Sequence, residues 1–403
     1  MKELSRIASA VQASTTMAID AMFKQMKADG VDVIGFGAGE PDFNTPDNIK
    51  AAGIAAIEQN ITRYTPAAGT VELRQAVCGR MKADYGLEYK PSQVVVSSGA
   101  KHLVYLALRA VVNPGDEVIL PAPYWVSYIE LIKMVGGVPV VVTATEAEHF
   151  KLTAEKLSAA ITPRTKAILL NNPSNPTGMM YDREELEAIA AVCTQADIYV
   201  ISDEIYACLA YDGRTFTSFA SLSADAKERT ILVNGVSKAY AMTGWRIGYA
   251  CANDVIAKVM ANYVSHSTGS PVAISQRAAA VALSGSQAEI ETMRQAFEQR
   301  RNYIVERMNA IPGVSCIQPE GAFYVMMNLE QLLGKTIHGV EITNDDVFAD
   351  AFLKYGLVAV VPGSGFGAPN FVRWSYATSM ENIKEGLDRL ETVSYTHLTL
   401  PTK

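Results

Sequence analysis

Residues 234–248 read Asn-Gly-Val-Ser-Lys-Ala-Tyr-Ala-Met-Thr-Gly-Trp-Arg-Ile-Gly and follow the apolar run Thr230 to Val233, which is typical of a buried strand. Ser237 and Lys238 therefore stand near the end of a strand, and Arg246 comes eight positions after the lysine. A lysine amine can hold a carbonyl compound as a Schiff base, and a hydroxyl with a nearby arginine can bind a phosphate. An ordinary surface lysine also explains the Ser-Lys pair, so the rest of the chain has to decide between these interpretations.

The size and composition indicate a globular protein with a large interior. A length of 403 residues is more than one small core needs and predicts two domains. Hydrophobic residues make up 49% and charged residues 19% of the chain, which is typical of a soluble globular protein. The net charge of −7 is unfavourable for a general nucleic-acid binder, which carries a basic surface. A small anionic ligand held by a few local cations stays compatible with this charge.

The cysteines and the N-terminal residues exclude several other classes of protein. The five cysteines are far apart and form no Cys-x-x-Cys pair, so neither a metal site nor a redox site is predicted. An odd number of cysteines in apolar surroundings is typical of reduced thiols, and we expect a cytoplasmic protein. The first residues contain no apolar signal core, and no apolar run reaches the length of a membrane span.

Apolar strands alternate with helices from Val94 to Cys251. Strands are predicted at residues 94–98, 118–120, 138–142, 167–170, 198–201, 230–233 and 247–251, and helices at 100–112, 124–134 and 183–196. Strands that are apolar throughout and separated by helices indicate a mostly parallel sheet with both faces covered. The predicted fold class is therefore α/β, and ligands of such sheets bind beyond the carboxyl ends of the strands.

Further helices and strands are predicted before and after this region. Before it, helices are expected at residues 14–27, 46–59 and 71–85 and a strand at 31–36; after it, one long helical stretch is expected from about 276 to 311. Short strands at 323–327, 358–361 and 372–376 and helices at 344–355 and 380–393 follow, and they indicate a second, smaller α+β domain. We assign residues 45–285 to the large domain and residues 1–44 with 286–393 to the small domain. Residues 394–403 carry no packing pattern, so we expect a tail foreign to the rest of the chain.

Two predicted strand ends carry groups that can bind an anion or a polar ligand. Gly99-Ala100-Lys101 lies where a strand becomes a helix, and the free backbone N–H groups of a helix start favour a bound phosphate. An ordinary strand–helix turn explains this motif as well. Asn175 lies in a loop rigidified by Pro173 and Pro176, where its side chain either donates to a ligand oxygen or closes an Asx turn.

Two further strands carry charged residues. Asp203 follows the strand 198–201, and Tyr206 comes three residues later. A buried carboxylate needs a cationic partner, for which a protonated pyridine nitrogen is suitable, but an aspartate at this place can also cap a helix. Arg373 lies in an apolar strand, where it either clamps a carboxylate or points to solvent. An aldehyde, a phosphate and a pyridine ring occur together in pyridoxal 5′-phosphate (PLP), which is the cofactor that this set of residues predicts.

Five motifs carry a resemblance to a known family. They are Ala38-Gly39-Glu40-Pro41-Asp42-Phe43, Tyr64-Thr65-Pro66-Ala67-Ala68-Gly69, Asn175-Pro176-Thr177-Gly178, Ser202-Asp203-Glu204-Ile205-Tyr206, and Ser237-Lys238 with Gly244-Trp245-Arg246-Ile247-Gly248. These motifs resemble those of the class I aminotransferases of PLP fold type I, from about Leu4 to Val393. Pro123-Tyr124-Trp125-Val126-Ser127-Tyr128 and Val361-Pro362-Gly363 narrow the resemblance to the bacterial subgroup of aspartate and prephenate aminotransferases.

The resemblance implies a role for each candidate residue at the cofactor. Lys238 is the Schiff-base lysine and carries the proton between the substrate Cα and the cofactor, while Asp203 pairs with the pyridine nitrogen. Hydrogen bonds to the ring hydroxyl oxygen come from Asn175 and Tyr206, and Trp125 stacks on the ring. The phosphate is bound at the Gly99 turn by the backbone N–H groups of Ala100 and Lys101, by Ser237 and Arg246, and by the partner subunit's Tyr64.

The resemblance also implies a substrate site, a reaction and an assembly. Arg373 clamps the α-carboxylate with help from the Gly39 backbone, and Lys101, with Thr16, meets a distal carboxylate beside Trp125 and Asn175. The amino group moves between L-aspartate, or a related dicarboxylic amino acid, and 2-oxoglutarate by a ping-pong mechanism. The active form is a homodimer with shared sites, to which Tyr64 and residues 265–270 contribute.

Several alternatives stay open on the sequence. Prephenate, glutamate or aromatic substrates fit the same subgroup, and a C–S lyase or decarboxylase fits the same fold because cofactor motifs do not select the bond that breaks. A PLP-sensing regulator without turnover needs a DNA-binding domain, for which we expect no room before Leu4. A dinucleotide-binding protein needs a Gly-x-Gly-x-x-Gly motif that opens a helix, and the sequence has none in that setting.

Overall fold

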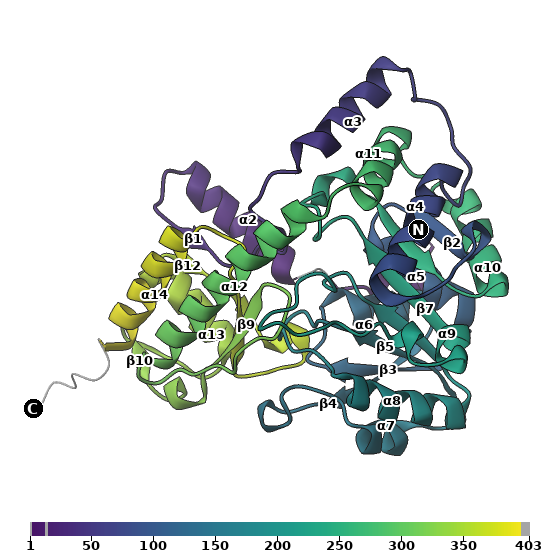
Figure 1. Cartoon of the computed structure of the whole chain (residues 1–403). Helices are drawn as coiled ribbons and strands as arrows, with labels where there is room; N and C mark the ends of the chain where they lie inside the picture. Colours follow the sequence, from purple (N-terminus) through teal and green to yellow (C-terminus); the bar gives the residue numbers. More distant parts are fainter. Residues whose placement is uncertain (1, 13–14, 396–403) are drawn as a thin grey trace, which may run out of the picture.

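The computed structural model describes residues 2–12 and 15–395, and it has a larger and a smaller part (Figure 1). The larger part contains a seven-stranded sheet with the strand order β2-β8-β7-β6-β5-β3-β4. The strands are β2 (Val94–Ser97), β3 (Glu117–Ala122), β4 (Val138–Thr143), β5 (Thr165–Asn171), β6 (Tyr199–Asp203), β7 (Thr230–Gly235) and β8 (Gly248–Cys251). All pairs among β3 to β7 are parallel and β8 is antiparallel to both neighbours, which confirms the predicted α/β class with a mostly parallel sheet.

Neighbouring residues of the strands alternate between apolar clusters on opposite faces of the sheet. Leu169 and Ile201 pack with α5 (Ala100–Val111), α6 (Ser127–Met134) and α10 (Asp254–Ser267). Ile168 and Val200 pack with α7 (Ala154–Ala160), α8 (Arg183–Ala196) and α9 (Ala224–Arg229). Val96 packs on that same second face with α3 (Asp47–Glu58), α4 (Val71–Tyr85) and α11 (Ala273–Ser284). Both faces are buried, which explains why the strands are apolar at consecutive positions.

The smaller part is built around a three-stranded antiparallel sheet in the order β13-β14-β9. Its strands are β9 (Tyr324–Asn328), β13 (Val361–Pro362) and β14 (Phe371–Ser375), with the short pairs β1 (Ile34–Gly35) and β12 (Val358–Ala359), and β10 (Thr336–Ile337) and β11 (Val340–Glu341). The helices are α1 (Arg6–Ser9), α2 (Thr15–Ala28), α12 (Ala288–Asn309), α13 (Asp345–Ala351) and α14 (Met380–Tyr395); α1 differs from the others because it lies against α6. The core of this part includes Phe297, Phe323, Trp374 and Leu387, all without exposed surface.

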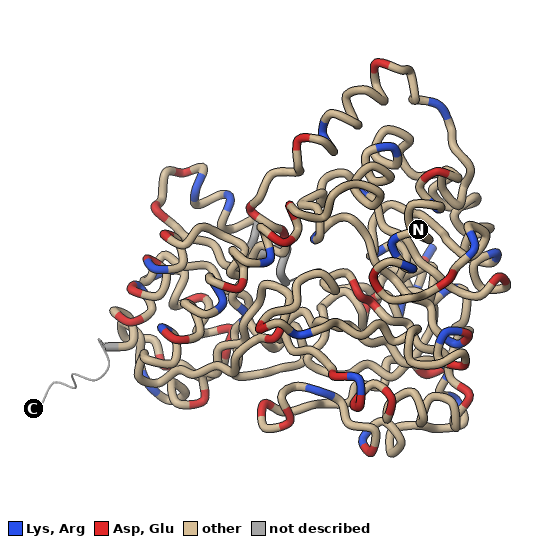
Figure 2. The backbone as a smooth tube through the Cα atoms, viewed as in Figure 1, with Lys and Arg blue, Asp and Glu red and all other residues tan. Residues whose placement is uncertain are grey.

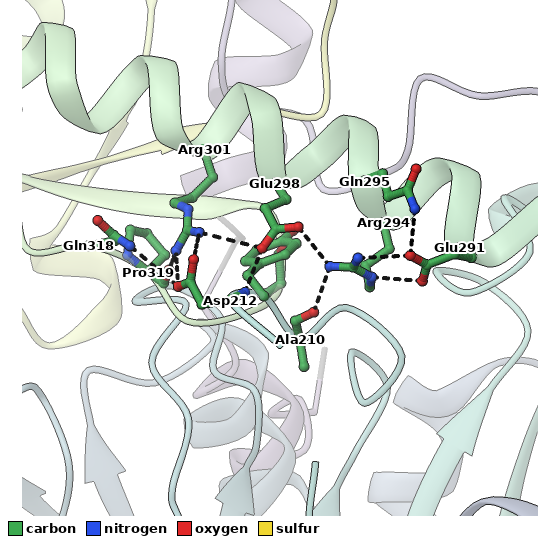
Figure 3. A network of polar contacts seen from close by, with 11 residues as sticks. Ala210, Asp212, Glu291, Arg294, Gln295, Glu298, Arg301, Gln318 and Pro319 are labelled. Carbon is green, nitrogen blue, oxygen red and sulfur yellow. Dashed lines mark hydrogen bonds and ion pairs between the residues drawn. The ribbon is translucent and has the colours of Figure 1, made fainter. Parts of the chain in front are cut away.

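A polar network ties α12 to the loop that follows Leu209 in the larger part (Figure 3). The guanidinium of Arg301 is fully buried and donates to both carboxylate oxygens of Asp212, at 2.9 and 2.7 Å, and to the carbonyl of Pro319 at 2.6 Å. Glu298 accepts from the backbone N–H of Asp212 at 2.5 Å and from Arg294 at 2.9 Å. The loop is therefore held to the helix by charge-assisted hydrogen bonds, which are stronger than neutral ones.

The helical stretch predicted from about 276 to 311 is wrong as a single element, because it consists of α11 and α12. Gly285 adopts an extended backbone, and the side chain of Gln287 donates to the carbonyls of Ala282 and Gly285. These bonds satisfy carbonyl groups at the end of α11 and stop the helix. The sequence analysis also missed α10, which begins at the cap Asn253, where the side chain accepts from the N–H of Ile256 at 2.9 Å.

The C-terminal helix, the charged residues and the apolar character of the helices can also be compared with the predictions. α14 continues to Tyr395, two residues beyond the predicted boundary, and residues 396–403 of the predicted tail lie outside the described residues. Figure 2 shows the positions of basic and acidic residues interspersed along the backbone. Among the residues that the structure describes, no helix combines the length and the apolar character that a membrane crossing requires.

Candidate active site

A cavity of about 370 Å³ opens at the carboxyl ends of β5, β6 and β7 and at the start of α5. It brings together eleven of the predicted site residues: Gly39, Ala100, Lys101, Trp125, Asn175, Asp203, Tyr206, Ser237, Lys238, Arg246 and Arg373. The charged residues in its wall are four cations (Lys101, Lys238, Arg246 and Arg373) and two carboxylates (Glu40 and Asp203). This surplus of positive charge is suited to an anionic ligand.

Lys238 lies at the centre of the charged groups. Its Nζ donates to the carbonyl of Gly39 at 2.5 Å. Burial lowers the pKa of Lys238 to about 8, against the opposing attraction of Glu40, and Arg246 lowers it further. A larger fraction of this amine than of an ordinary lysine is therefore in the free form near neutral pH, which is the form that attacks a carbonyl or takes up a proton.

Asp203, at the end of β6, is a buried carboxylate whose hydrogen-bond donors are neutral. The hydroxyl of Tyr128 donates to Oδ2 at 2.7 Å, and the backbone N–H of Ile205 donates to Oδ1 at 3.2 Å. Burial raises the pKa of Asp203 to about 6, although both hydrogen bonds act in the opposite direction. A cationic N–H group of a ligand would supply the positive counter-charge that the Asp203 carboxylate lacks.

The start of α5 forms a cradle for an anion. Gly99 has a φ of +89°, and a Cβ atom there would lie 2.5 Å from Nη2 of Arg246. Arg246 donates to the carbonyls of Thr243 at 2.9 Å and Ser98 at 3.1 Å, so its guanidinium lies across the helix start. Gly248 permits the same close approach, because a Cβ atom there would lie 2.5 Å from the N atom of Ala100. The free N–H groups and the guanidinium therefore face one small space, as phosphate binding requires.

Arg373, on β14, is buried without a carboxylate partner among the described residues. Its Nη1 donates to Oδ1 of Asn175 and its Nη2 to the carbonyl of Gly37, both at 2.9 Å. The guanidinium lies over the rings of Tyr324, at 4.5 Å, and Phe366, at 4.9 Å. Its Nε has no partner, and burial lowers the pKa of the group. A ligand carboxylate would neutralise this charge.

Lys101 points along the cavity towards Trp125. Its Nζ lies 4.8 Å from the centre of the Trp125 ring, and burial, followed by repulsion from Arg246, lowers its pKa. Of the other predicted site residues, Gly99 lies at the start of α5 beside Arg246 without lining the wall, and Tyr64 is fully exposed. Thr16 belongs to α2, and its side chain lies outside the described residues.

Two tyrosines of the site, Tyr128 and Tyr324, were not predicted from the sequence. Tyr128 lies in a motif used for the resemblance, but nothing in the sequence connects it with Asp203. Tyr324 lies inside an apolar strand, where an aromatic residue is usually interpreted as core. Its hydroxyl lies 2.9 Å from the hydroxyl of Tyr206, and its ring lies under Arg373. In the described part of the chain, no group of three His, Cys, Asp or Glu side chains is arranged to bind a metal ion.

The fold and the site agree with a known class of enzyme. The family described as "Aminotransferase class I and II" matches residues 31–390, and the chain belongs to this family, whose class I members use PLP. Among curated proteins it is similar to an aspartate aminotransferase of Bacillus sp. (strain YM-2), with 49% identity over 97% of this chain and 99% of the relative.

Two other relatives extend this result. An aspartate/prephenate aminotransferase of Cereibacter sphaeroides is 47% identical over 97% of this chain and 98% of its own. The solved structure of the aspartate aminotransferase from Thermus thermophilus with maleate superimposes with a TM-score of 0.92, at 41% identity, and covers 98% of this chain and 100% of the other. These comparisons confirm the family that the motifs of the sequence predicted.

Proposed function

We propose that this protein is a PLP-dependent transaminase that moves an amino group between L-aspartate and 2-oxoglutarate by a ping-pong mechanism. The observation that carries the proposal is the position of Lys238, a lysine with a pKa of about 8, in one cavity with Asp203, Arg246 and Arg373. The two guanidiniums and the buried carboxylate correspond to the phosphate, the carboxylate and the cationic ring nitrogen of the reacting molecules. The relatives with more than 40% identity that carry the name aspartate aminotransferase support the same substrate.

The residues present fit PLP at each of its charged groups. Asp203 would face the ring nitrogen, Asn175 and Tyr206 would donate to the ring hydroxyl oxygen, and Trp125 would cover one face of the ring. Gly99, Ala100, Lys101, Ser237 and Arg246 would surround the phosphate. When bound, PLP supplies an electron sink that stabilises negative charge at the substrate Cα.

Lys238 would carry the proton of the reaction. Its amine, with a pKa lowered by burial, is free to accept the Cα proton and to return it to the other reacting carbon. Arg373 would hold the α-carboxylate and thereby orient the Cα–H bond towards this amine. Lys101, with Thr16, would bind the distal carboxylate. The maleate of the Thermus thermophilus structure is likewise a dicarboxylate, which supports this assignment.

We further propose a cytoplasmic homodimer in which the partner subunit's Tyr64 reaches the phosphate. The full exposure of Tyr64 supports this proposal, because a large aromatic side chain in water is available for contact with a second chain. Residues 265–270 would contribute to the same boundary. The proposed domains are residues 45–285, and residues 1–44 with 286–393.

The test is the visible absorption spectrum of the purified protein with PLP, before and after L-aspartate is added without an oxo acid. We expect a yellow band that disappears with aspartate and returns with 2-oxoglutarate. A Lys238→Ala variant should show neither the band nor turnover. If no band forms even with added PLP, the proposed function is wrong.

A second candidate substrate is prephenate, which the name of the Cereibacter sphaeroides relative supports. Both reactions use Arg373 in the same way, so they differ only in the group beyond the α-carbon. A band that is unaffected by aspartate but lost with glutamate and recovered with prephenate would favour this candidate. Lys101→Ala should weaken the dicarboxylic amino acids far more than alanine or phenylalanine, and an equal loss would argue against its role.

A further inference from the structure

Tyr324 occupies a central place in the site that neither the family motifs nor the proposed mechanism uses. It lies on β9 of the smaller part and has no exposed surface. Its ring lies 4.5 Å below the guanidinium of Arg373, and its hydroxyl lies 2.9 Å from that of Tyr206, which belongs to the larger part. A Cβ atom on Gly39 would lie 3.3 Å from the same hydroxyl. One side chain therefore contacts Arg373 and Tyr206, and its hydroxyl leaves no room for a side chain at Gly39 without a shift of a few tenths of an ångström.

We propose that Tyr324 is a positioning residue with two separable tasks: its ring fixes the carboxylate-binding arginine Arg373, and its hydroxyl holds Tyr206 towards the cofactor. This inference rests on the proposed function, because it concerns how the same site is arranged.

The ring accounts for the first task. Arg373 has no carboxylate partner among the described residues, so its position depends on two neutral acceptors and on the rings of Tyr324 and Phe366. A guanidinium over an aromatic face is attracted by the ring, most strongly where water is excluded. The platform of Tyr324 therefore keeps Arg373 in place without neutralising the charge that a substrate carboxylate needs.

The hydroxyl accounts for the second task. The Tyr206 hydroxyl has one hydrogen bond among the described residues, to Tyr324. Either hydroxyl can be the donor in this pair. When a ligand oxygen in the cavity accepts the Tyr206 proton, the Tyr324 hydroxyl is the one that donates to the Tyr206 oxygen. A hydroxyl that accepts one hydrogen bond also becomes a stronger donor in the next. Tyr206 is in this way oriented as a donor towards a ligand oxygen.

The surroundings of the two hydroxyls are simple enough for a clear test. Among the described residues, the charged groups that face them are Arg373 and Asp203, and the other titratable groups are the hydroxyls of Tyr128, near Tyr206, and Tyr376, near Tyr324. Lys238, Arg246 and Glu40 are the other charged groups of the same cavity beside Lys101. Substitutions that keep these groups unchanged therefore isolate the effect of Tyr324.

The experiment compares Tyr324→Phe with Tyr324→Leu. Phe keeps the ring and removes the hydroxyl, so we expect a KM for L-aspartate within about twofold of wild type and a kcat about fivefold lower, the size of one lost hydrogen bond. We also expect the pH midpoint of the visible absorbance change of bound PLP to rise, because a weaker donor stabilises the deprotonated form less. Leu removes both parts, so KM and the Kd for succinate should rise by roughly 10- to 30-fold in addition.

Phe366→Leu is the matched control, since the ring of Phe366 also contacts the guanidinium of Arg373, at 4.9 Å, but carries no hydroxyl. It should raise KM and leave the pH midpoint unchanged. The inference is wrong if Tyr324→Phe leaves the pH midpoint unchanged. It is also wrong if Tyr324→Phe and Tyr324→Leu raise KM equally. These outcomes are read on protein that binds PLP and responds to aspartate. A wild-type protein without a yellow band contradicts the proposed function instead.

Discussion

Arg301 and Arg373 are both buried arginines over a tyrosine ring, and they differ in what neutralises them. Arg301 lies 5.1 Å from the ring centre of Tyr211 and Arg373 lies 4.5 Å from that of Tyr324, and in both cases Nε has no partner. Arg301 forms two hydrogen bonds with the carboxylate of Asp212, whereas Arg373 has only neutral acceptors in the described part of the chain. A buried charge without a counter-charge costs stability.

This difference separates an arginine that holds the fold together from one that waits for a ligand. The network around Arg301 joins α12 to a loop of the larger part and neutralises the guanidinium with the carboxylate of Asp212 (Figure 3). Arg373 is held in position by rings and amide oxygens, and its charge stays available. The same contrast holds for the two acids: Asp212 is paired with an arginine, and Asp203 has neutral donors and is beside the cavity.

The largest expected effect is on catalysis, in Arg373→Met. The value of kcat/KM for L-aspartate should fall by roughly 100- to 1,000-fold, because removing one side of a buried charged contact costs about 2–5 kcal/mol. The free energy of unfolding of the cofactor-free protein should stay the same or increase, because an unpaired buried charge is removed. Steady-state kinetics and urea unfolding measure the two quantities. A clear loss of stability would mean that Arg373 is structural.

The reverse result is expected for Arg301→Met, the same substitution at the paired arginine. The free energy of unfolding should fall by about 3 kcal/mol, which is the low end for breaking a buried pair because Asp212 is partly exposed and can be rehydrated. The kcat/KM at a temperature where the variant is folded should stay within about twofold of wild type, since Arg301 does not line the cavity. A selective loss of activity without loss of stability would remove the distinction between the two arginines.

The two acids should respond to pH with opposite signs. Burial raises the pKa of Asp203 from its ordinary value of 3.8 to about 6 in the folded protein. The contribution of Asp203 to the free energy of unfolding is therefore fully present below pH 3.8 and is lost as the pH rises through 6. The stability of cofactor-free Asp203→Asn relative to wild type should therefore increase, by up to about 3 kcal/mol, between about pH 4 and pH 7.

Asp212→Asn is the matched control for this pH experiment. Hydrogen bonds from Arg301 lower the pKa of Asp212, so its contribution is present at neutral pH and is lost as the pH falls. The variant should be less stable than wild type at neutral pH and approach it in acid. Urea unfolding at a series of pH values gives both curves. Two curves with the same sign would show that the carboxylates are not in opposite environments.

Much of this site was predictable, because it follows from where strands end. Lys238, Asp203 and Asn175 each follow an apolar run, and parallel strands bring their carboxyl ends to one edge of a sheet. Arg246 was predicted with them, since it lies close in the sequence to the lysine. The antiparallel direction of β8 was not predicted. It depends on how the segment between Lys238 and Gly248 folds back, which no periodicity records.

The partners of these residues were not predictable for a related reason. Tyr128 and Tyr324 occupy a helix and an apolar strand, and an aromatic residue there has the same pattern whether it fills the core or donates to a buried acid. Their roles depend on contacts across 75 and 118 positions of the chain. The adjacent residues Arg300 and Arg301 show the same limit, because α12 turns them to different surroundings.

Arg300 provides the smallest effect and extends the comparison to a third arginine. It pairs with both oxygens of Asp42, at 2.7 and 3.0 Å, and lies over the rings of Phe43 and Phe297, but both partners of the pair are partly exposed. Arg300→Gln should lower the free energy of unfolding by about 1 kcal/mol, the sum of a partly exposed ion pair and a cation–π contact.

Most of the ion-pair part of this loss should disappear in about 0.5 M salt. The loss in Arg301→Met should persist, because a buried pair is hardly screened. Urea unfolding at low and high salt separates the two, and an Arg300 effect as large and as insensitive to salt as that of Arg301 would mean that burial does not set the strength of these pairs.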